Sequence, residues 1–181
     1  MIKSERQVHE FAPVYDRNSK ILILGTFPSV KSRENHFYYG HPQNRFWKVL
    51  ASLMKEKLPE SIEEKKQLLL SHGIAIWDVI ASCDIVGSSD SSIKNVVPCD
   101  LMKVLGSCDI KAIFANGKTA EKLYNRYSLP ITGIPIHALP STSPANAAFQ
   151  IDRLLNSWNV ICDYTRCEMT PASQQECGWH F

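Results

Sequence analysis

The sequence predicts a three-layer α/β/α domain, in which helices cover both faces of a central, four-stranded and mainly parallel sheet. Two observations support this fold class. Short apolar runs rich in β-branched residues alternate along the chain with amphipathic helical stretches, the pattern of parallel strands joined by helices. The chain has 181 residues, of which 44% are hydrophobic and 21% charged, and this size and composition fit a single globular domain.

Four apolar runs are the predicted strands, and they span residues 21–24, 74–77, 110–115 and 134–138. We expect the first and third runs to be neighbouring parallel strands, in units whose helical connections are right-handed. Pro135 lies in the fourth run. Because proline cannot donate a hydrogen bond to a neighbouring strand, this run is predicted to be an edge strand or to begin there.

Helical segments fill the intervals between these strands. Apolar residues recur at three- and four-residue spacing over 42–57, and Pro42 suits the first position of that helix. Ser61 and Glu64 form a capping-box signature for a second helix, and Gly73 stands where it would stop. Further helices are predicted from about residue 98 to 105, over 117–127 and over 146–158.

Composition sets the limits of the domain and its cellular setting. Residues 1–162 are predicted to form one domain, followed by a polar tail over 163–181. The net charge of +2 neither demands nor excludes a polyanionic partner. The six cysteines form no C-x-x-C pair, which favours reduced thiols. No apolar run approaches the ~20 residues of a membrane span, and no secretory signal is visible, so we expect a cytoplasmic protein. We also expect a monomer.

Polar and turn-forming segments follow the predicted strands. Because the carboxyl ends of parallel strands meet at one edge of a sheet, where open α/β folds bind ligands, we expect these segments to form a site. Glycine, proline, serine and asparagine are also ordinary turn residues, so each segment alone has a structural explanation. The segments are residues 25–29, 38–44, 78 with 87–92, 116–118 and 139–146.

Several side chains in these segments suit a flat polar ligand, although each also has a plain structural role. Asn44 lies in the first turn of a predicted helix, where its amide can hold a water or a polar ring, or only complete the helix start. Tyr38 and Tyr39 can stack on a flat ring or belong to the core. Asn116 offers a donor and an acceptor to the edge of a heterocycle, or to a turn. The three hydroxyls within residues 140–144 can cradle phosphate oxygens.

Other catalytic motifs do not occur in the sequence. It contains no Walker loop, no G-x-G-x-x-G and no G-x-S-x-G element, and its histidines have no H-E-x-x-H spacing. We therefore expect neither a metal ion nor a cofactor.

Six strings then occur in a recognisable order: Leu-Gly-Thr-Phe-Pro-Ser at 24–29, Tyr-Gly-His-Pro-Gln-Asn-Arg-Phe-Trp at 39–47, Gly-Ile-Ala-Ile-Trp-Asp-Val at 73–79, Gly-Ser-Ser-Asp-Ser-Ser-Ile at 87–93, Asn-Gly-Lys at 116–118 and Leu-Pro-Ser-Thr-Ser-Pro-Ala-Asn at 139–146. In this combination the chain resembles the uracil-DNA glycosylase superfamily, and within it the DNA-deoxyinosine (hypoxanthine-DNA) glycosylases. The resemblance covers about residues 8–162 and implies the α/β fold of that superfamily.

The resemblance also implies roles for individual residues. Phe27 stands where the similar mismatch-specific uracil glycosylases carry their catalytic amide, and the catalytic role passes by resemblance to Asn44, with Asp78 the next candidate. Tyr39 matches the aromatic that stacks on the flipped base, Asn116 matches the asparagine that binds the edge of the base, and Phe27 belongs to the same base-binding group. The residues implied in holding DNA phosphates or entering the duplex are Ser29, Lys118, Ser141, Thr142, Ser143, Pro144, Ala145 and Asn146, with Arg45 as a further cation.

The implied activity is hydrolysis of the N-glycosidic bond of a deaminated base, namely hypoxanthine, with uracil and xanthine as further lesions, in double-stranded or single-stranded DNA. Swinging such a base out of the helix costs a few kcal/mol, and least when the base is badly paired. The protein must then orient a water and hydrogen-bond the departing base. Two alternatives stay open: a DNA-binding module of this fold without turnover, which Phe27 favours, and an enzyme that acts on free nucleosides.

Overall fold

The central sheet contains four parallel strands in the order β3-β2-β6-β7. Ile21 of β2 pairs with Ile74 of β3 on one side and with Ala112 of β6 on the other. The prediction of a four-stranded parallel sheet is confirmed, including the neighbouring first and third runs and the edge position of the run that contains Pro135. In this computed structural model, which describes residues 3–165, the strands are β2 Ile21–Gly25, β3 Ile74–Asp78, β6 Ala112–Asn116 and β7 Ile136–Leu139.

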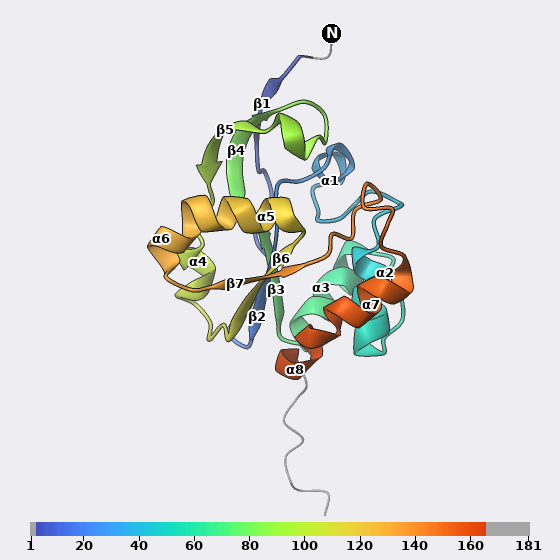
Figure 1. Cartoon of the computed structure of the whole chain (residues 1–181). Helices are drawn as coiled ribbons and strands as arrows, with labels where there is room; N and C mark the ends of the chain where they lie inside the picture. The colour runs from blue at the N-terminus through green and yellow to red at the C-terminus, as the bar shows by residue number, and fades with distance from the viewer. Residues whose placement is uncertain (1–2, 166–181) are drawn as a thin grey trace, which may run out of the picture.

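Burial explains why the strand sequences are continuously apolar. Every residue of β2, β3 and β6 is buried, because helices cover both faces of a parallel sheet. Figure 1 shows α2, α3 and α7 on one side of the sheet and α4, α5 and α6 on the other. The largest fully buried side chains include Trp158, Tyr38, Tyr124, Phe46 and Phe114.

The helices are α1 Val30–Asn35, α2 Phe46–Met54, α3 Ile62–Ser71, α4 Met102–Leu105, α5 Lys118–Leu123, α6 Leu129–Thr132, α7 Ile151–Trp158 and α8 Cys162–Thr165. The capping box is confirmed at α3, where the Ser61 hydroxyl accepts a hydrogen bond from the Glu64 N–H at 3.1 Å. The Glu64 carboxylate reaches back to the Glu60 N–H at 2.7 Å. A short π-helical segment, Tyr124–Ser128, joins α5 to α6.

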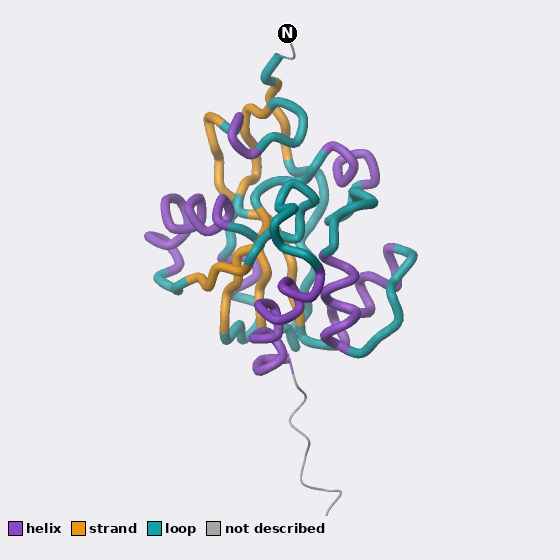
Figure 2. Tube along the Cα trace, turned by 45° about the vertical axis from the view of Figure 1, so that its right-hand side comes forward, coloured by secondary structure: helices purple, strands orange, loops and turns teal. Residues whose placement is uncertain are grey.

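A second, antiparallel sheet was not predicted. It has the order β1-β4-β5, with β1 Glu5–Val8, β4 Ile80–Ile85 and β5 Lys94–Pro98. Only Val79 separates β4 from β3, so the chain passes from the central sheet straight into the second one. Residues 87–92, assigned from the sequence to a segment after the second strand, instead join β4 to β5. In Figure 2 the loops gather between the two sheets.

Three predicted helix starts are wrong. The helix predicted from Pro42 begins at Phe46, the one predicted near residue 98 begins at Met102, and the one predicted from Asn146 begins at Ile151. The second error arises because residues 94–98 form a strand of the unpredicted second sheet, paired antiparallel with β4. The other two arise because residues 41–45 and 142–149 contact each other through hydrogen bonds described below.

The described chain ends in α8, where Thr165 is buried. Three residues that were assigned to the polar tail, 163–165, therefore belong to the folded part, and the remainder of the predicted tail lies outside the described residues. Among the helices of residues 3–165, none has the length and apolar character that crossing a membrane requires.

Candidate active site

A cleft of about 560 Å³ opens at the carboxyl ends of the four parallel strands. The segment that follows each strand contributes to it, as expected for the switch region of an open α/β sheet. The loop between β4 and β5 adds a further wall. The lining residues are Gly25–Ser29, Ser32, Tyr38, Tyr39, His41, Asn44, Asp78, Ser88–Ser91, Asn116 and Ser141–Ala145.

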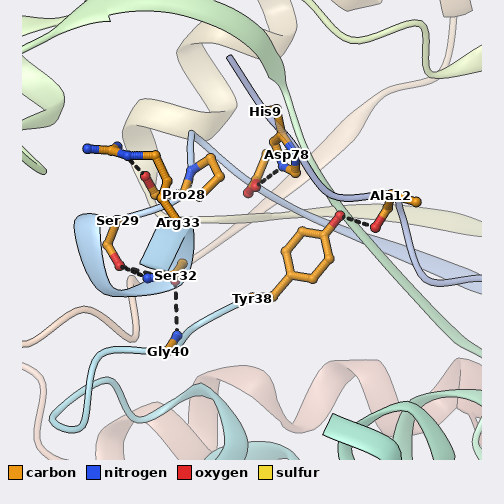
Figure 3. Close-up of polar contacts among 9 residues, drawn as sticks. All are labelled: His9, Ala12, Pro28, Ser29, Ser32, Arg33, Tyr38, Gly40 and Asp78. Carbon is orange, nitrogen blue, oxygen red and sulfur yellow. Dashed lines mark hydrogen bonds and ion pairs between the residues drawn. The ribbon is translucent and has the colours of Figure 1, made fainter. Parts of the chain in front are cut away.

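Asp78 lies on the floor of the cleft in a buried pair with His9. The Oδ2 atom of Asp78 is 2.7 Å from Nε2 of His9, and the two side chains are only 6% and 3% exposed (Figure 3). A Cβ atom at Gly25 would lie 2.4 Å from Oδ1 of Asp78, so only glycine leaves room for this carboxylate. His9 was not predicted, because it follows the unpredicted strand β1 and belongs to no motif.

Asn44, Thr142 and Asn116 form one hydrogen-bonded chain across the cleft. Asn44 Oδ1 accepts from the Phe46 N–H at 2.9 Å and from the Thr142 hydroxyl at 2.9 Å. Asn116 donates from Nδ2 to the Thr142 hydroxyl at 2.9 Å, and its Oδ1 accepts from the Thr142 N–H at 3.0 Å. Thr142 therefore joins the two asparagines that sequence analysis selected independently.

Arg45 holds the loop that contains Thr142. Its guanidinium donates to four backbone carbonyls, those of Thr142, Ser143, Asn146 and Phe149. Its own backbone N–H also donates to the Thr142 carbonyl at 3.1 Å. This corrects the expectation that Arg45 serves as a cation for DNA phosphates, since its donors are occupied within the protein. It also explains why residues 146–149 are not helical.

Tyr39 is placed by its contacts with α2. Its backbone has φ of +52°, and its ring stacks on Phe46 with centroids 3.9 Å apart. The Tyr39 hydroxyl oxygen is buried and makes no hydrogen bond to residues 3–165. Burial, followed by the negative charge of Asp78, raises the pKa of this hydroxyl, while the nearby Asn116 amide opposes the rise. Tyr38 is a core residue instead, whose hydroxyl donates to the Ala12 carbonyl at 2.8 Å.

Two loops that form the mouth of the cleft are tied together. Ser29 caps α1 by accepting from the Ser32 N–H at 3.2 Å, and the Val30 N–H donates to the Ser88 hydroxyl at 2.9 Å. The guanidinium of Arg33 bridges the Pro28 and Gly87 carbonyls (Pro28 is shown in Figure 3).

Asp90 also lines the cleft, on the loop between β4 and β5, and was not selected from the sequence. Desolvation, followed by the negative charge of Asp78, raises the pKa of its carboxyl, and the Thr26 hydroxyl opposes this. Its only sequence signal was membership of the string at 87–93.

The structure brings most of the sequence-selected residues together. Phe27, Ser29, Tyr39, Asn44, Asp78, Asn116 and residues 141–145 all line the cleft. Three do not. Arg45 binds the carbonyls of the loop, Asn146 shapes the loop by donating to the Ser141 carbonyl at 3.0 Å, and Lys118 is exposed at the first position of α5. Within residues 3–165, no group of three or more potential metal-ligating side chains converges.

The family model of the uracil DNA glycosylase superfamily matches residues 12–161. A protein named hypoxanthine DNA glycosylase from Methanosarcina acetivorans is 34% identical over 153 residues, which cover 83% of this chain and 95% of that one. A protein of the same name from Methanosarcina barkeri is 35% identical over 111 residues, covering 60% and 70%. The solution NMR structure of a candidate uracil DNA glycosylase from Methanosarcina acetivorans superimposes with a TM-score of 0.72 at 32% identity, covering 83% of this chain and 93% of the other.

Proposed function

This chain belongs to the uracil DNA glycosylase superfamily, and we propose that its cleft receives a deaminated base flipped out of DNA, hypoxanthine foremost, and hydrolyses the bond between that base and its sugar. One observation carries the proposal: all six motif strings contribute residues to a single cleft large enough for a purine nucleoside. Two relatives named hypoxanthine DNA glycosylase support the choice of lesion. We further propose that the protein acts as a cytoplasmic monomer without a cofactor.

Asn44 is the proposed catalytic residue, and its hydrogen bonds specify which end of the amide faces the substrate. The Phe46 N–H requires an acceptor, so the atom 2.9 Å away must be the amide oxygen. The amide nitrogen points the other way and is available to donate. A donor there can hold the attacking water or bind an acceptor of the departing base, where negative charge accumulates as the bond breaks.

The loop of residues 141–145 is proposed to bind DNA phosphates. It offers the hydroxyls of Ser141 and Ser143 as donors, whereas the N–H groups of Thr142, Ser143 and Ala145 are bonded within the protein. Arg45 binds the carbonyls of the loop, which leaves the opposite face of the loop for the ligand. Gly117, with φ of +99°, lets this loop approach α5, because a Cβ there would lie 3.2 Å from the Ser141 Cβ. Phosphates held near the sugar also stabilise the cation-like sugar that forms when the bond breaks.

Single-turnover cleavage of a duplex with one deoxyinosine tests the function. We expect an abasic site and free hypoxanthine, and no release of base from the matched undamaged duplex. A second candidate, a binding module without turnover, is favoured by Phe27, which lines the cleft where relatives carry an amide. That candidate predicts tight binding of the same duplex without cleavage. Cleavage of free deoxyinosine at a similar rate would instead support a nucleoside hydrolase.

A further inference from the structure

Asn116, the residue expected to read the edge of the base, already uses both ends of its amide. Its nitrogen donates to the Thr142 hydroxyl and its oxygen accepts from the Thr142 N–H, at 2.9 and 3.0 Å. Asn116 is also buried. These bonds hold the loop of residues 141–145 in place and use one N–H and one lone pair of the amide, so the orientation of Asn116 is fixed and other polar atoms of the cleft can share the recognition of the base.

Two such atoms converge above Gly25. A Cβ atom at Gly25 would lie 2.4 Å from Asp78 Oδ1 and 3.2 Å from the Tyr39 hydroxyl oxygen, so the two oxygens border the same small space on the cleft floor. Asp78 Oδ2 is occupied by His9, which leaves Oδ1 as the acceptor that faces this space. The Tyr39 hydroxyl makes no hydrogen bond of normal geometry within residues 3–165, although the Asn116 amide lies close enough to oppose the rise of its pKa. A buried hydroxyl without a partner is costly, and a ligand acceptor would satisfy it.

One of the two oxygens is a hydrogen-bond donor and the other is an acceptor. Burial and the charge of Asp78 keep the Tyr39 hydroxyl protonated, so it is a donor. The carboxylate of Asp78 is an acceptor. The floor of the cleft therefore presents one acceptor beside one donor.

We propose that Asp78 and Tyr39 recognise the lactam edge of the deaminated base, with Asp78 Oδ1 accepting its ring N–H and the Tyr39 hydroxyl donating to its adjacent carbonyl. This inference rests on the proposed function. Hypoxanthine presents N1–H beside C6=O, and uracil presents N3–H beside C4=O. Adenine and cytosine present the reverse order, a ring acceptor beside an amino donor, and would leave Asp78 and Tyr39 without partners.

The site therefore distinguishes hypoxanthine from adenine and uracil from cytosine. Guanine and thymine carry the same edge, but their stable pairing keeps them in the duplex. The proposal also places Asp78 against the base rather than against water, and leaves Asn44 as the residue at the reacting bond.

The test measures equilibrium affinity for duplexes that carry an uncleavable, 2′-fluorinated deoxyinosine or the corresponding deoxynebularine, a purine that lacks both N1–H and C6=O. We expect the wild-type protein to bind the inosine duplex more tightly. Tyr39→Phe, which keeps the ring on Phe46, is expected to reduce this preference about 3- to 10-fold, the value of one neutral hydrogen bond. Asp78→Asn is expected to reduce it by about 10-fold.

Tyr124→Phe is the matched control. Tyr124 is buried like Tyr39 but does not line the cleft, and its hydroxyl donates to the Ile134 carbonyl at 2.7 Å, so its loss is expected to leave the ratio of the two affinities unchanged. If Asp78→Asn fails to fold, as judged by its melting curve, Tyr39→Phe alone decides. An unchanged preference in Tyr39→Phe, or equal wild-type affinity for the two duplexes, would overturn the proposal. Because the assay measures binding only, it stands apart from the cleavage assay that tests the proposed function.

Discussion

At the scale of single residues, the site is organised by buried polar groups that pair with each other rather than with solvent. His9 and Asp78 pair at 2.7 Å with almost no exposure, and Thr142 holds Asn44 and Asn116 through its hydroxyl and its N–H. Buried groups of this kind are expensive unless their partners are supplied, so each residue determines the orientation of the next.

Asn44→Ala should lower the single-turnover rate of deoxyinosine cleavage by about 10²- to 10³-fold, because one hydrogen bond at the reacting bond is lost. Affinity for the uncleavable duplex should change little by comparison. A folded variant that cleaves at the wild-type rate would refute the role of Asn44. Asp78 would then be the next catalytic candidate.

His9→Gln and His9→Asn form a matched pair of uncharged variants. The Gln amide nitrogen can reach the position of the His9 Nε2 atom and donate to Asp78, whereas the Asn amide is one bond too short. We expect His9→Gln to keep the preference for the inosine duplex over the nebularine duplex. His9→Asn should reduce the ratio of the two affinities by roughly 10-fold, because Asp78 is no longer held by a hydrogen bond. Equal losses in both variants would contradict a positioning role and would indicate that the imidazole itself is needed.

At the scale of elements, the loops rather than the helices form the cleft, and Arg45 fixes the conformation of the loop of residues 141–145. Arg45 lies between Asn44 and the first residue of α2, and binds carbonyls about 100 residues further along the chain. The start of α2, the loop of residues 141–145 and the start of α7 are therefore one unit. The helices α2 and α7 also contact each other and lie on the same side of the sheet (Figure 1).

Arg45→Lys should lower the free energy of unfolding by about 2–4 kcal/mol, because an ammonium cannot replace a fork of donors that binds several carbonyls. Urea unfolding measures this. Arg126→Lys is the control, since Arg126 is exposed and its guanidinium lies over the ring of Tyr127, and should change stability by less than about 0.5 kcal/mol. Equal stability of the two variants would show that the loop holds its shape without Arg45.

At the scale of the whole molecule, a net charge of +2 implies that no large excess of cations holds DNA. Arg45 and Arg33 direct their guanidinium groups to backbone carbonyls, which reduces the number of cations available near the cleft. We therefore expect hydroxyls of residues 141–145, those of Ser141 and Ser143 above all, to be the main phosphate contacts. Such contacts release few counterions.

The logarithm of DNA affinity should therefore fall with the logarithm of salt concentration at a shallow slope, about −0.9 for each of roughly two to four neutralised phosphates. Replacing Ser141 and Ser143 together by alanine should weaken binding to all sequences alike, because phosphate contacts position the protein without reading bases. A titration over several salt concentrations measures both effects. A steep slope, or a double variant that binds normally and changes its preferred base, would show that another surface holds the backbone.

The sequence by itself determined the central sheet and the identity of most cleft residues. Strand periodicity and burial are local properties of the apolar runs, and the carboxyl ends of parallel strands must meet at one edge, so Asn44, Asp78 and residues 141–145 could be placed together in advance. Only the tertiary structure decided the second sheet, the starts of α2 and α7, and the pairing of His9 with Asp78. The pairing of β1 with β4, the two helix starts and the His9–Asp78 pair depend on partners 69 to 104 residues apart in sequence, as in the bonds of Asp78 to His9 and of Phe149 to Arg45. No local pattern records such a partner, because a buried polar group is satisfied by whichever donor or acceptor the folded chain brings beside it.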